Sequence, residues 1–139
     1  MKRTILFLIF PLLLILNACG SSSSKENEKL RAEVIAVHDE VMPKMGQLQS
    51  LQRKAIEKAE EMQAQEPVDS SAVEEYKALA YDLNIAYEAM FDWMHQYEPE
   101  DGEMSEEELK KYLDGQMVLI TEVNQDVKAA LAKADELLK

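Results

Sequence analysis

The chain has 139 residues and a formal charge of −12 at pH 7, because 27 acidic side chains outnumber 15 basic ones. Nucleic acids and anionic lipid surfaces are bound by basic patches, so this charge argues against nucleic acid as a partner. Glycine and proline are scarce, with four of each, and a single cysteine excludes an intrachain disulfide. The rest of the composition, rich in Ala, Leu, Glu, Lys and Gln, favours an all-α protein.

The first 18 residues have the features of a secretory signal peptide. Lys2 and Arg3 are followed by an apolar run, Thr4–Leu16, that is too short for a comfortable membrane span. The run ends in the sequence LNAC, with the only cysteine at position 19. An ordinary signal peptide followed by an accidental cysteine is the alternative interpretation. Removal of residues 1–18 would make the formal charge −14, because this segment holds two basic residues and no acidic one.

The sequence LNAC at residues 16–19 resembles the lipobox of bacterial lipoproteins. The resemblance implies that Cys19 becomes the mature N-terminus and carries palmitate or related acyl chains, two or three of which make a stable membrane anchor. Gly20 and Ser21, with no aspartate directly after the cysteine, favour the outer membrane by resemblance to the lipoprotein sorting rule. The stretch KENE at 25–28 weakly resembles a signal for export to the cell surface, so both the periplasmic face and the cell surface stay open.

Residues 29–139 are predicted to form the folded domain. Residues 19–28 are predicted to be the lipidated cysteine and a short flexible tether, because a run of serines precedes a charged stretch. Apolar residues then recur in steps of three and four over three segments, at about 29–65, 70–98 and 105–139. No alternating apolar run is long enough to predict a strand.

Prolines and helix caps mark the connections between these segments. Pro67 and Pro99 follow the first and second segments. The sequences SAVE at 71–74 and SEEE at 105–108 have the pattern of capping boxes, although Asp69 or the serine after it could cap the second helix instead. Short connections make neighbouring helices antiparallel. The sequence therefore predicts an elongated antiparallel three-helix bundle with coiled-coil-like seams, after a lipoprotein signal peptide and tether.

The stretch HDEVMPKM, His38 to Met45, places a proline inside the first predicted helix. Pro43 removes one hydrogen bond and clashes with the carbonyl of Asp39, at a cost of about 3 kcal/mol. A kink that bends the helix around its partners is the simpler interpretation. The alternative is that the kink turns His38 and Asp39 toward a functional site.

A second unusual stretch, AMFDWMHQYEP at residues 89–99, holds the only tryptophan and the other histidine. Antiparallel pairing of the first two helices places Met42 level with Trp93 and His38 level with Tyr97. The two unusual stretches are therefore predicted to meet.

The second connection, centred near residue 102, is predicted to be a turn that places Leu109 beside Met94. The two unusual stretches would then share the end of the bundle that holds the 99–104 loop. Sequence positions alone carry this prediction, because antiparallel helices on either side of a turn pair at equal distances from it.

The histidines and methionines of the two stretches suggest a soft-metal site. His38, Met42 and Met45 lie at i, i+4 and i+7 on one helix face, and thioether and imidazole ligands suit Cu(I). Methionine stripes also fill cores, which is the simpler interpretation, and no HxxxH or CxxC motif is present. The candidate Cu(I) ligands are His38, Met42, Met45, Met94 and His95.

The stretches VHDEVMPKM and YEAMFDWMHQYEP, in this order after a lipobox, resemble a group of small helical lipoproteins from Bacteroidetes, sometimes labelled viral A-type inclusion protein-like. The resemblance covers nearly all of the chain after the signal peptide and implies no known activity. No serine, threonine or tyrosine lies beside a histidine in the sequence as a catalytic elbow would place it, so no catalytic residue and no enzyme activity are predicted.

The predicted function is binding, by a lipid-anchored interaction module of the outer membrane. The expected partner is an envelope protein or a second copy of the chain, and no cofactor is expected unless the alternative Cu(I) site exists. The candidate interaction surface consists of Met42, Met45, Trp93, Met94 and His95. An outward-facing Trp93 would be an interface anchor of the kind that dominates binding, whereas an inward-facing one would be core.

Overall fold

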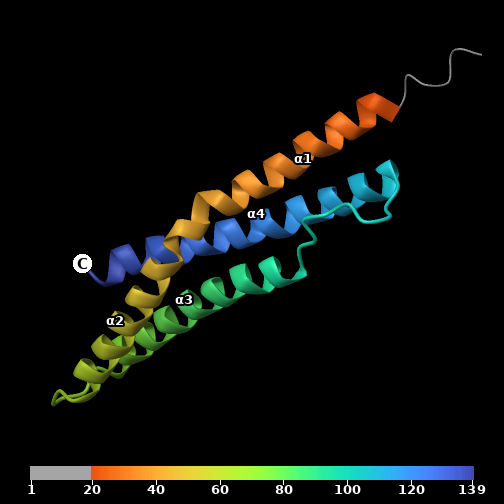
Figure 1. Cartoon of the computed structure of the whole chain (residues 1–139). Helices are drawn as coiled ribbons and strands as arrows, with labels where there is room; N and C mark the ends of the chain where they lie inside the picture. The colour runs from red at the N-terminus through yellow and green to blue at the C-terminus, as the bar shows by residue number, and fades with distance from the viewer. Residues whose placement is uncertain (1–19) are drawn as a thin grey trace, which may run out of the picture.

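The computed structural model describes residues 20–139, which fold into helices connected by irregular segments (Figure 1). No strand occurs in this part of the chain, so the prediction of an all-α bundle is confirmed. No helix within residues 20–139 combines the length and the apolar character that crossing a membrane requires. The elements are α1 (Gly20–Val41), the 3₁₀ turn η1 (Met42–Lys44), α2 (Met45–Gln63), α3 (Ser70–Gln96) and α4 (Glu106–Leu137).

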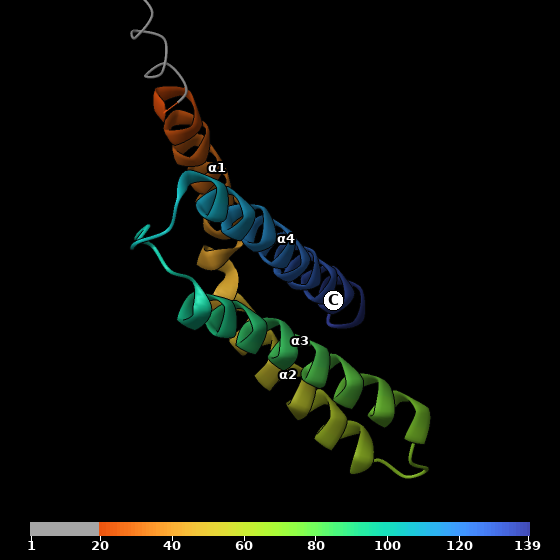
Figure 2. The ribbon, with the colours of Figure 1, turned by 90° about the vertical axis from the view of Figure 1, so that its right-hand side faces the viewer.

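The first predicted helix, for which the sequence predicted a kink at Pro43, is broken there into two helices. Pro43 is the middle residue of η1, which separates α1 from α2. α1 packs mainly against α4, and α2 packs mainly against α3, while α3 and α4 pack against each other. Figure 2 shows these two pairs, with α1 beside α4 and α2 beside α3. The proline therefore lies where the long helix changes its partner.

We call α1, η1 and α2 together the bent helix. α4 runs in the same direction as α1 and lies beside the first part of this bent helix. Near its beginning, the side chain of Asn27 donates a hydrogen bond to the carbonyl of Glu106, at 2.9 Å. Near its end, Lys54 Nζ donates to the carbonyl of Leu138, at 2.8 Å. α4 thus spans the levels of residues 27 to 54 on the bent helix.

α3 runs in the opposite direction and is displaced toward the far end of the molecule. Gln52 donates to the side chain of Asn84 at 3.1 Å, and the ring centroids of His38 and Trp93 are 5.5 Å apart. All three helices therefore overlap only between about residues 38 and 54. The largest fully buried side chains come from α1, α2, α3 and α4: Leu48, Leu79, Leu83, Met90, Leu113, Ile120, Val34, Val41 and Val127.

The connection between α3 and α4, residues 97–105, is long and lies alongside α1. α3 ends beside His38 whereas α4 begins beside Asn27, about eleven residues earlier, or roughly 16 Å along the helix. The chain crosses this distance and reverses at Gly102, whose φ of +59° is one that glycine adopts freely. The prediction that Leu109 lies beside Met94 is therefore wrong. A tight turn would start α4 beside the end of α3, whereas α4 starts about eleven residues nearer the beginning of α1.

Helix caps define where α3 and α4 begin. Asp69 caps α3 by accepting hydrogen bonds from the backbone N–H groups of Ser71 and Ala72, both at 3.1 Å, so the predicted capping box at 71–74 is replaced by the alternative cap at position 69. α4 begins with the predicted capping box, in which Ser105 and Glu108 exchange hydrogen bonds.

Residues 20–28 belong to α1, so the predicted flexible tether is wrong over the residues that the structure describes. Asn27 is only 3% exposed, and its side chain donates to both the carbonyl and the carboxylate of Glu106, at 2.9 and 2.8 Å. These contacts with α4 fix a segment whose serine-rich beginning has little helix propensity of its own. The predicted signal peptide and Cys19 lie outside the described residues.

Candidate functional site

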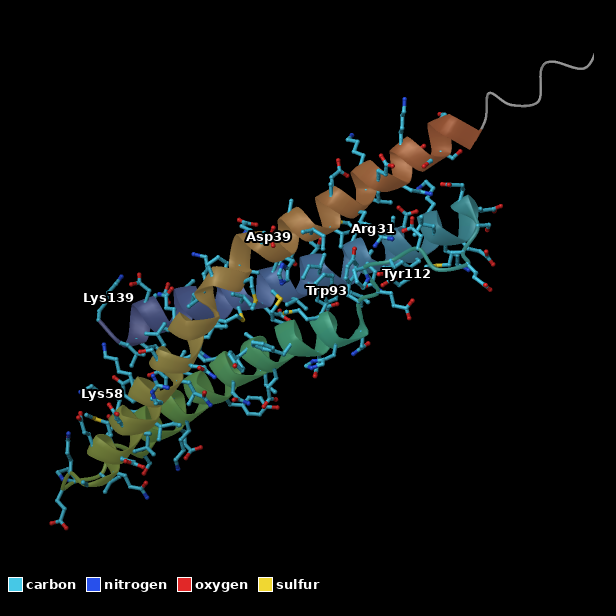
Figure 3. The ribbon with its side chains drawn as sticks, viewed as in Figure 1. Arg31, Asp39, Lys58, Trp93, Tyr112 and Lys139 are labelled. Carbon is cyan, nitrogen blue, oxygen red and sulfur yellow. The ribbon has the colours of Figure 1, made fainter. Side chains whose placement is uncertain are left out.

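The two unusual stretches of the sequence meet where α1, α3 and α4 converge. The ring of His38 lies 5.5 Å from that of Trp93, and Trp93 stacks on Tyr97 at 4.8 Å. Their predicted meeting is confirmed, but the pairing of the two helices is shifted by about one helical turn. His38 contacts Trp93 rather than Tyr97, and Tyr97 is instead bonded to Arg31. Figure 3 shows Arg31, Trp93 and Tyr112 gathered in this part of the molecule.

Arg31 and Tyr112 extend this group into what we call the aromatic cluster: Arg31, His38, Trp93, Tyr97 and Tyr112. The guanidinium carbon of Arg31 lies 6.0 Å from the centre of the Tyr97 ring, within reach of a cation–π contact. The same guanidinium donates to the Tyr97 hydroxyl at 3.0 Å, to the Glu98 carbonyl at 3.1 Å and to the Asp101 carboxylate. The Tyr112 hydroxyl accepts a hydrogen bond from the Glu98 N–H, at 2.7 Å.

These contacts make the aromatic cluster a clamp for the 97–105 connection. Burial lowers the pKa of Arg31, but its hydrogen bonds and attraction to Tyr97 and Asp101 outweigh this effect, so the pKa is raised and the guanidinium stays charged. Trp93 is only 6% exposed. Within residues 20–139, its indole N–H and the side-chain oxygen of Gln116 are the two buried side-chain polar atoms without a hydrogen-bond partner. Trp93 is thus in the interior, whereas the other four residues of the cluster are half-buried.

The five residues of the predicted interaction surface do not form one exposed patch. Met45 and Trp93 are buried, at 5% and 6% exposure, and Met42 is half-buried against the core. Met94 and His95 are exposed. Met45 and Trp93 occupy core-facing positions of their helices, which is the outcome that the sequence prediction associated with an inert core.

The two histidines among the five candidate Cu(I) ligands have different surroundings. His38 packs on Trp93, and its Nδ1 lies 2.8 Å from the Asp39 carboxylate. His95 follows Trp93 by two residues, a rotation of about 200° around the helix, and its Nδ1 lies 2.6 Å from the carbonyl of Phe91. His38 and His95 are therefore on different sides of α3. Among the described residues, no three or more His, Cys, Asp or Glu side chains come together as metal ligands.

A different feature, which the sequence did not single out, is a groove between α3 and α4. Its volume is about 300 Å³. Ala86 and Ala130 are buried in it, whereas Tyr81 and Ile85 stand exposed, at 66% and 42%. The groove is lined by Tyr81, Asp82, Ile85, Ala86, Asp126, Ala129, Ala130 and Lys133.

Two further exposed apolar side chains lie about three helical turns before the groove on α4. Val118 and Leu119 are 67% and 48% exposed. Val118 and Ala129 are eleven residues apart, as are Leu119 and Ala130, and this spacing places each pair on nearly the same side of the helix. We call this surface the α3/α4 face, and it consists of Tyr81, Ile85, Val118 and Leu119 together with the alanines of the groove.

A signal for the α3/α4 face is present in the sequence. Tyr81, Ile85 and Val118 are large apolar residues that fall outside the main three-and-four stripes of their helices. Such off-stripe residues are common on protein surfaces and carry no information alone. Only the packing of α3 on α4 shows that they lie along one groove. Comparison with known proteins gives no match for this chain, whether to a protein family model, to a curated protein or to a solved structure.

Proposed function

We propose that this chain is a lipoprotein of the bacterial outer membrane, anchored through Cys19, that acts by binding another protein rather than by catalysis. The observation that carries the proposal is the α3/α4 face. A groove of about 300 Å³ is lined by the exposed Tyr81 and Ile85, and Val118 and Leu119 are exposed about three turns earlier on nearly the same side of α4. Seven large apolar side chains are exposed in residues 20–139, so more than half of them lie on this one side. Exposed apolar surface next to a concave groove is typical of interaction sites.

The helical structure of residues 20–41 supports a role for the anchor in presenting this face. An acylated Cys19 would adjoin a helix that continues into the bundle, without a long tether between them. Glu40 on α1 pairs with Lys128 on α4 at 2.6 Å. Glu40 is twenty residues from Gly20, or about 30 Å along the helix. The middle of the α3/α4 face would therefore be held about 30 Å from the membrane anchor.

The chemistry of the groove supports binding over catalysis. Its lining is dominated by alanines, Ile85 and Tyr81, and its charged pair, Asp82 and Lys133, is joined by an ion pair of 2.6 Å. The imidazoles of His38 and His95 lie elsewhere, against Asp39 and the Phe91 carbonyl. Such a groove offers shape and apolar contact to a partner side chain.

The anchor is tested by growing cells with an alkyne analogue of palmitate and comparing the full chain with its Cys19→Ala variant. We expect the wild-type chain to be labelled and to fractionate with the outer membrane, and we expect the variant to lose both properties. Equal labelling of the two chains, or an unlabelled wild-type chain, would contradict the proposed anchor.

The binding face is tested by photo-crosslinking in intact cells. p-Benzoylphenylalanine replaces Tyr81 on the α3/α4 face or, as the matched control, Ile56, which is 43% exposed on α2. We expect a discrete crosslinked product of higher mass at position 81 and none of the same mass at position 56. The absence of any product at position 81, or the same products at both positions, would contradict the proposed function.

A further inference from the structure

We infer that the partner of the α3/α4 face is a cationic amphipathic helix, one that presents an apolar stripe flanked by Lys or Arg side chains. This inference rests on the proposed function, because it assumes that the face binds a protein. Its evidence is separate, however, and comes from the shape of the face and from the charges along its edges.

The shape fits a helix lying parallel to α3 and α4. Ala86 and Ala130 are buried at 2% and 5% exposure, and these small side chains let a partner side chain enter between the helices. From Val118 to Lys133 the face extends fifteen residues along α4, or about 22 Å, which is the length of four helical turns. A partner helix could therefore place apolar residues at i, i+3, i+4 and i+7 along the groove.

The edges of the face are acidic. Glu88 and Asp92 follow Ile85 on α3 by three and seven residues, so they continue its side of the helix. Glu122 precedes Asp126 on α4 by four residues, and Asp126 lines the groove. All four carboxylates are exposed.

These four carboxylates have no internal partner, as is also true of other exposed carboxylates such as Glu57 and Glu75 in the described part of the chain. Elsewhere, carboxylates such as Glu40, Asp101 and Asp114 are held in ion pairs with Lys128, Arg31 and Lys110. In the described part of the chain, no hydrogen bond or ion pair involves the side chains of Glu88, Asp92, Glu122 or Asp126, and the one lysine of the groove is occupied by Asp82. The negative charge along the face is therefore available to a partner.

Charge decides between the possible occupants. A second copy of the chain would bring the same acidic edges against this face, and the whole chain carries a formal charge of −12. Like charges placed across an interface oppose association, whereas opposite charges speed and direct it. A helix with basic residues on both sides of its apolar stripe would place each basic residue near one acidic edge.

The test uses the full-length protein in a nonionic detergent, immobilised through a C-terminal tag, and three labelled 18-residue peptides. The first peptide has leucines at steps of three and four and lysines elsewhere, so that it forms a cationic amphipathic helix. The second has the same composition in a shuffled order without a stripe, and the third has glutamate in place of lysine. Binding of peptide to detergent alone adds the same background to every protein variant.

Matched variants separate the contributions of shape and charge. Ile85→Gln with Leu119→Gln removes apolar surface and keeps every charge, and Glu122→Gln with Asp126→Asn removes two charges and keeps the apolar surface. We expect each double variant to weaken binding of the cationic amphipathic peptide about tenfold or more. Ile56→Gln, at an exposed position on α2, should change it less than twofold. The substituted side chains are exposed, so the variants should keep their helical circular dichroism.

The possible outcomes are distinct. Binding that is equal for the cationic and shuffled peptides, binding that is insensitive to Ile85→Gln with Leu119→Gln, tighter binding of the glutamate peptide, or no binding would each overturn the inference. A crosslinked product at position 81 together with any of these results would leave the face as a binding site with a partner of different chemistry. A crosslinked product with the mass of two chains would assign the face to a second copy and would also overturn the inference.

Discussion

The aromatic cluster and the α3/α4 face are opposites in how their side chains are used. In the cluster, the Trp93 side chain is almost fully buried, and the Arg31 guanidinium donates hydrogen bonds to three residues of the 97–105 connection. On the α3/α4 face, ordinary residues such as Ile85 and Glu122 lie exposed. The conspicuous residues therefore mark a place where this fold is held together. Exposed residues of common types mark the place where it is proposed to bind a partner.

The largest predicted effect is loss of stability on removing the centre of the cluster. Trp93→Ala deletes a buried ring that contacts His38 and Tyr97, and such deletions in cores cost about 3–5 kcal/mol. The free energy of unfolding is measured by urea denaturation. Met94→Ala is the control. Met94 follows Trp93 directly and is 38% exposed, so this substitution should cost about 1 kcal/mol or less. Equal losses for both variants would contradict an interior role for Trp93.

The second effect is release of the 97–105 connection. Arg31→Ala removes the donor to Tyr97, Glu98 and Asp101, and we expect a loss of about 1–3 kcal/mol. Because the connection contains several glutamates, a glutamate-specific protease should cleave the variant there much faster than the wild type. Lys29→Ala, on a 79% exposed side chain of the same helix, should leave the cleavage rate unchanged. Slow cleavage of the Arg31 variant would show that other contacts hold the connection.

The third effect is smaller and concerns the cap of α4, next to the clamped connection. Ser105→Ala should cost about 1 kcal/mol at pH 7, since it removes the N-cap hydroxyl. The Ser105 hydroxyl and backbone N–H both donate to Glu108, and these bonds hold the pKa of that carboxyl below its usual range.

The lowered pKa of Glu108 gives a pH dependence of known sign. A carboxyl whose pKa is lower in the folded chain stabilises the fold above its unfolded pKa, and this contribution disappears as the pH falls through the folded pKa. Wild type should therefore be more stable than Glu108→Gln at pH 7, and the difference should shrink on acidification below the usual pKa of a glutamate. Urea denaturation at several pH values measures it. A difference that grows toward low pH would contradict the assigned hydrogen bonds.

The smallest effect on stability is predicted for the α3/α4 face. Val118→Ser, at a 67% exposed position, should change the free energy of unfolding by about 0.5 kcal/mol or less. The same substitution should weaken the crosslink at position 81, since it removes apolar surface from the proposed interface. This is the reverse of the result expected for Trp93→Ala, which should lose stability first. Normal crosslinking at position 81 in the Val118→Ser variant would show that Val118 on α4 is not part of the binding surface.

Local sequence signals predicted much of the fold because their causes are local. Three-and-four spacing predicted the helices, Pro43 predicted a bend where α1 and α2 are in fact separated, and the pair Ser105 and Glu108 predicted the start of α4. Each of these features depends on residues within about one turn of the helix. The meeting of His38 with the Trp93 stretch also followed, because the connection between α2 and α3 is short.

The errors come from contacts between residues far apart in the sequence. The stagger of α4 depends on Arg31 holding the 97–105 connection along α1, and the early start of α1 depends on Asn27 bonding Glu106. The α3/α4 face depends on small side chains, Ala86 and Ala130, whose positions across from each other follow from that stagger. No local pattern encodes these relations, so the predicted site consists of conspicuous residues that do not share one surface.

The most direct test of the contrast between the two regions compares two crosslinking positions in the same living cells. p-Benzoylphenylalanine is placed at Val118, on the α3/α4 face, or at Met94, which is exposed beside the aromatic cluster. We expect a discrete product of higher mass at position 118 and none at position 94. A product at position 94 with none at position 118 would contradict this expectation, and would return the binding surface to the residues around Trp93.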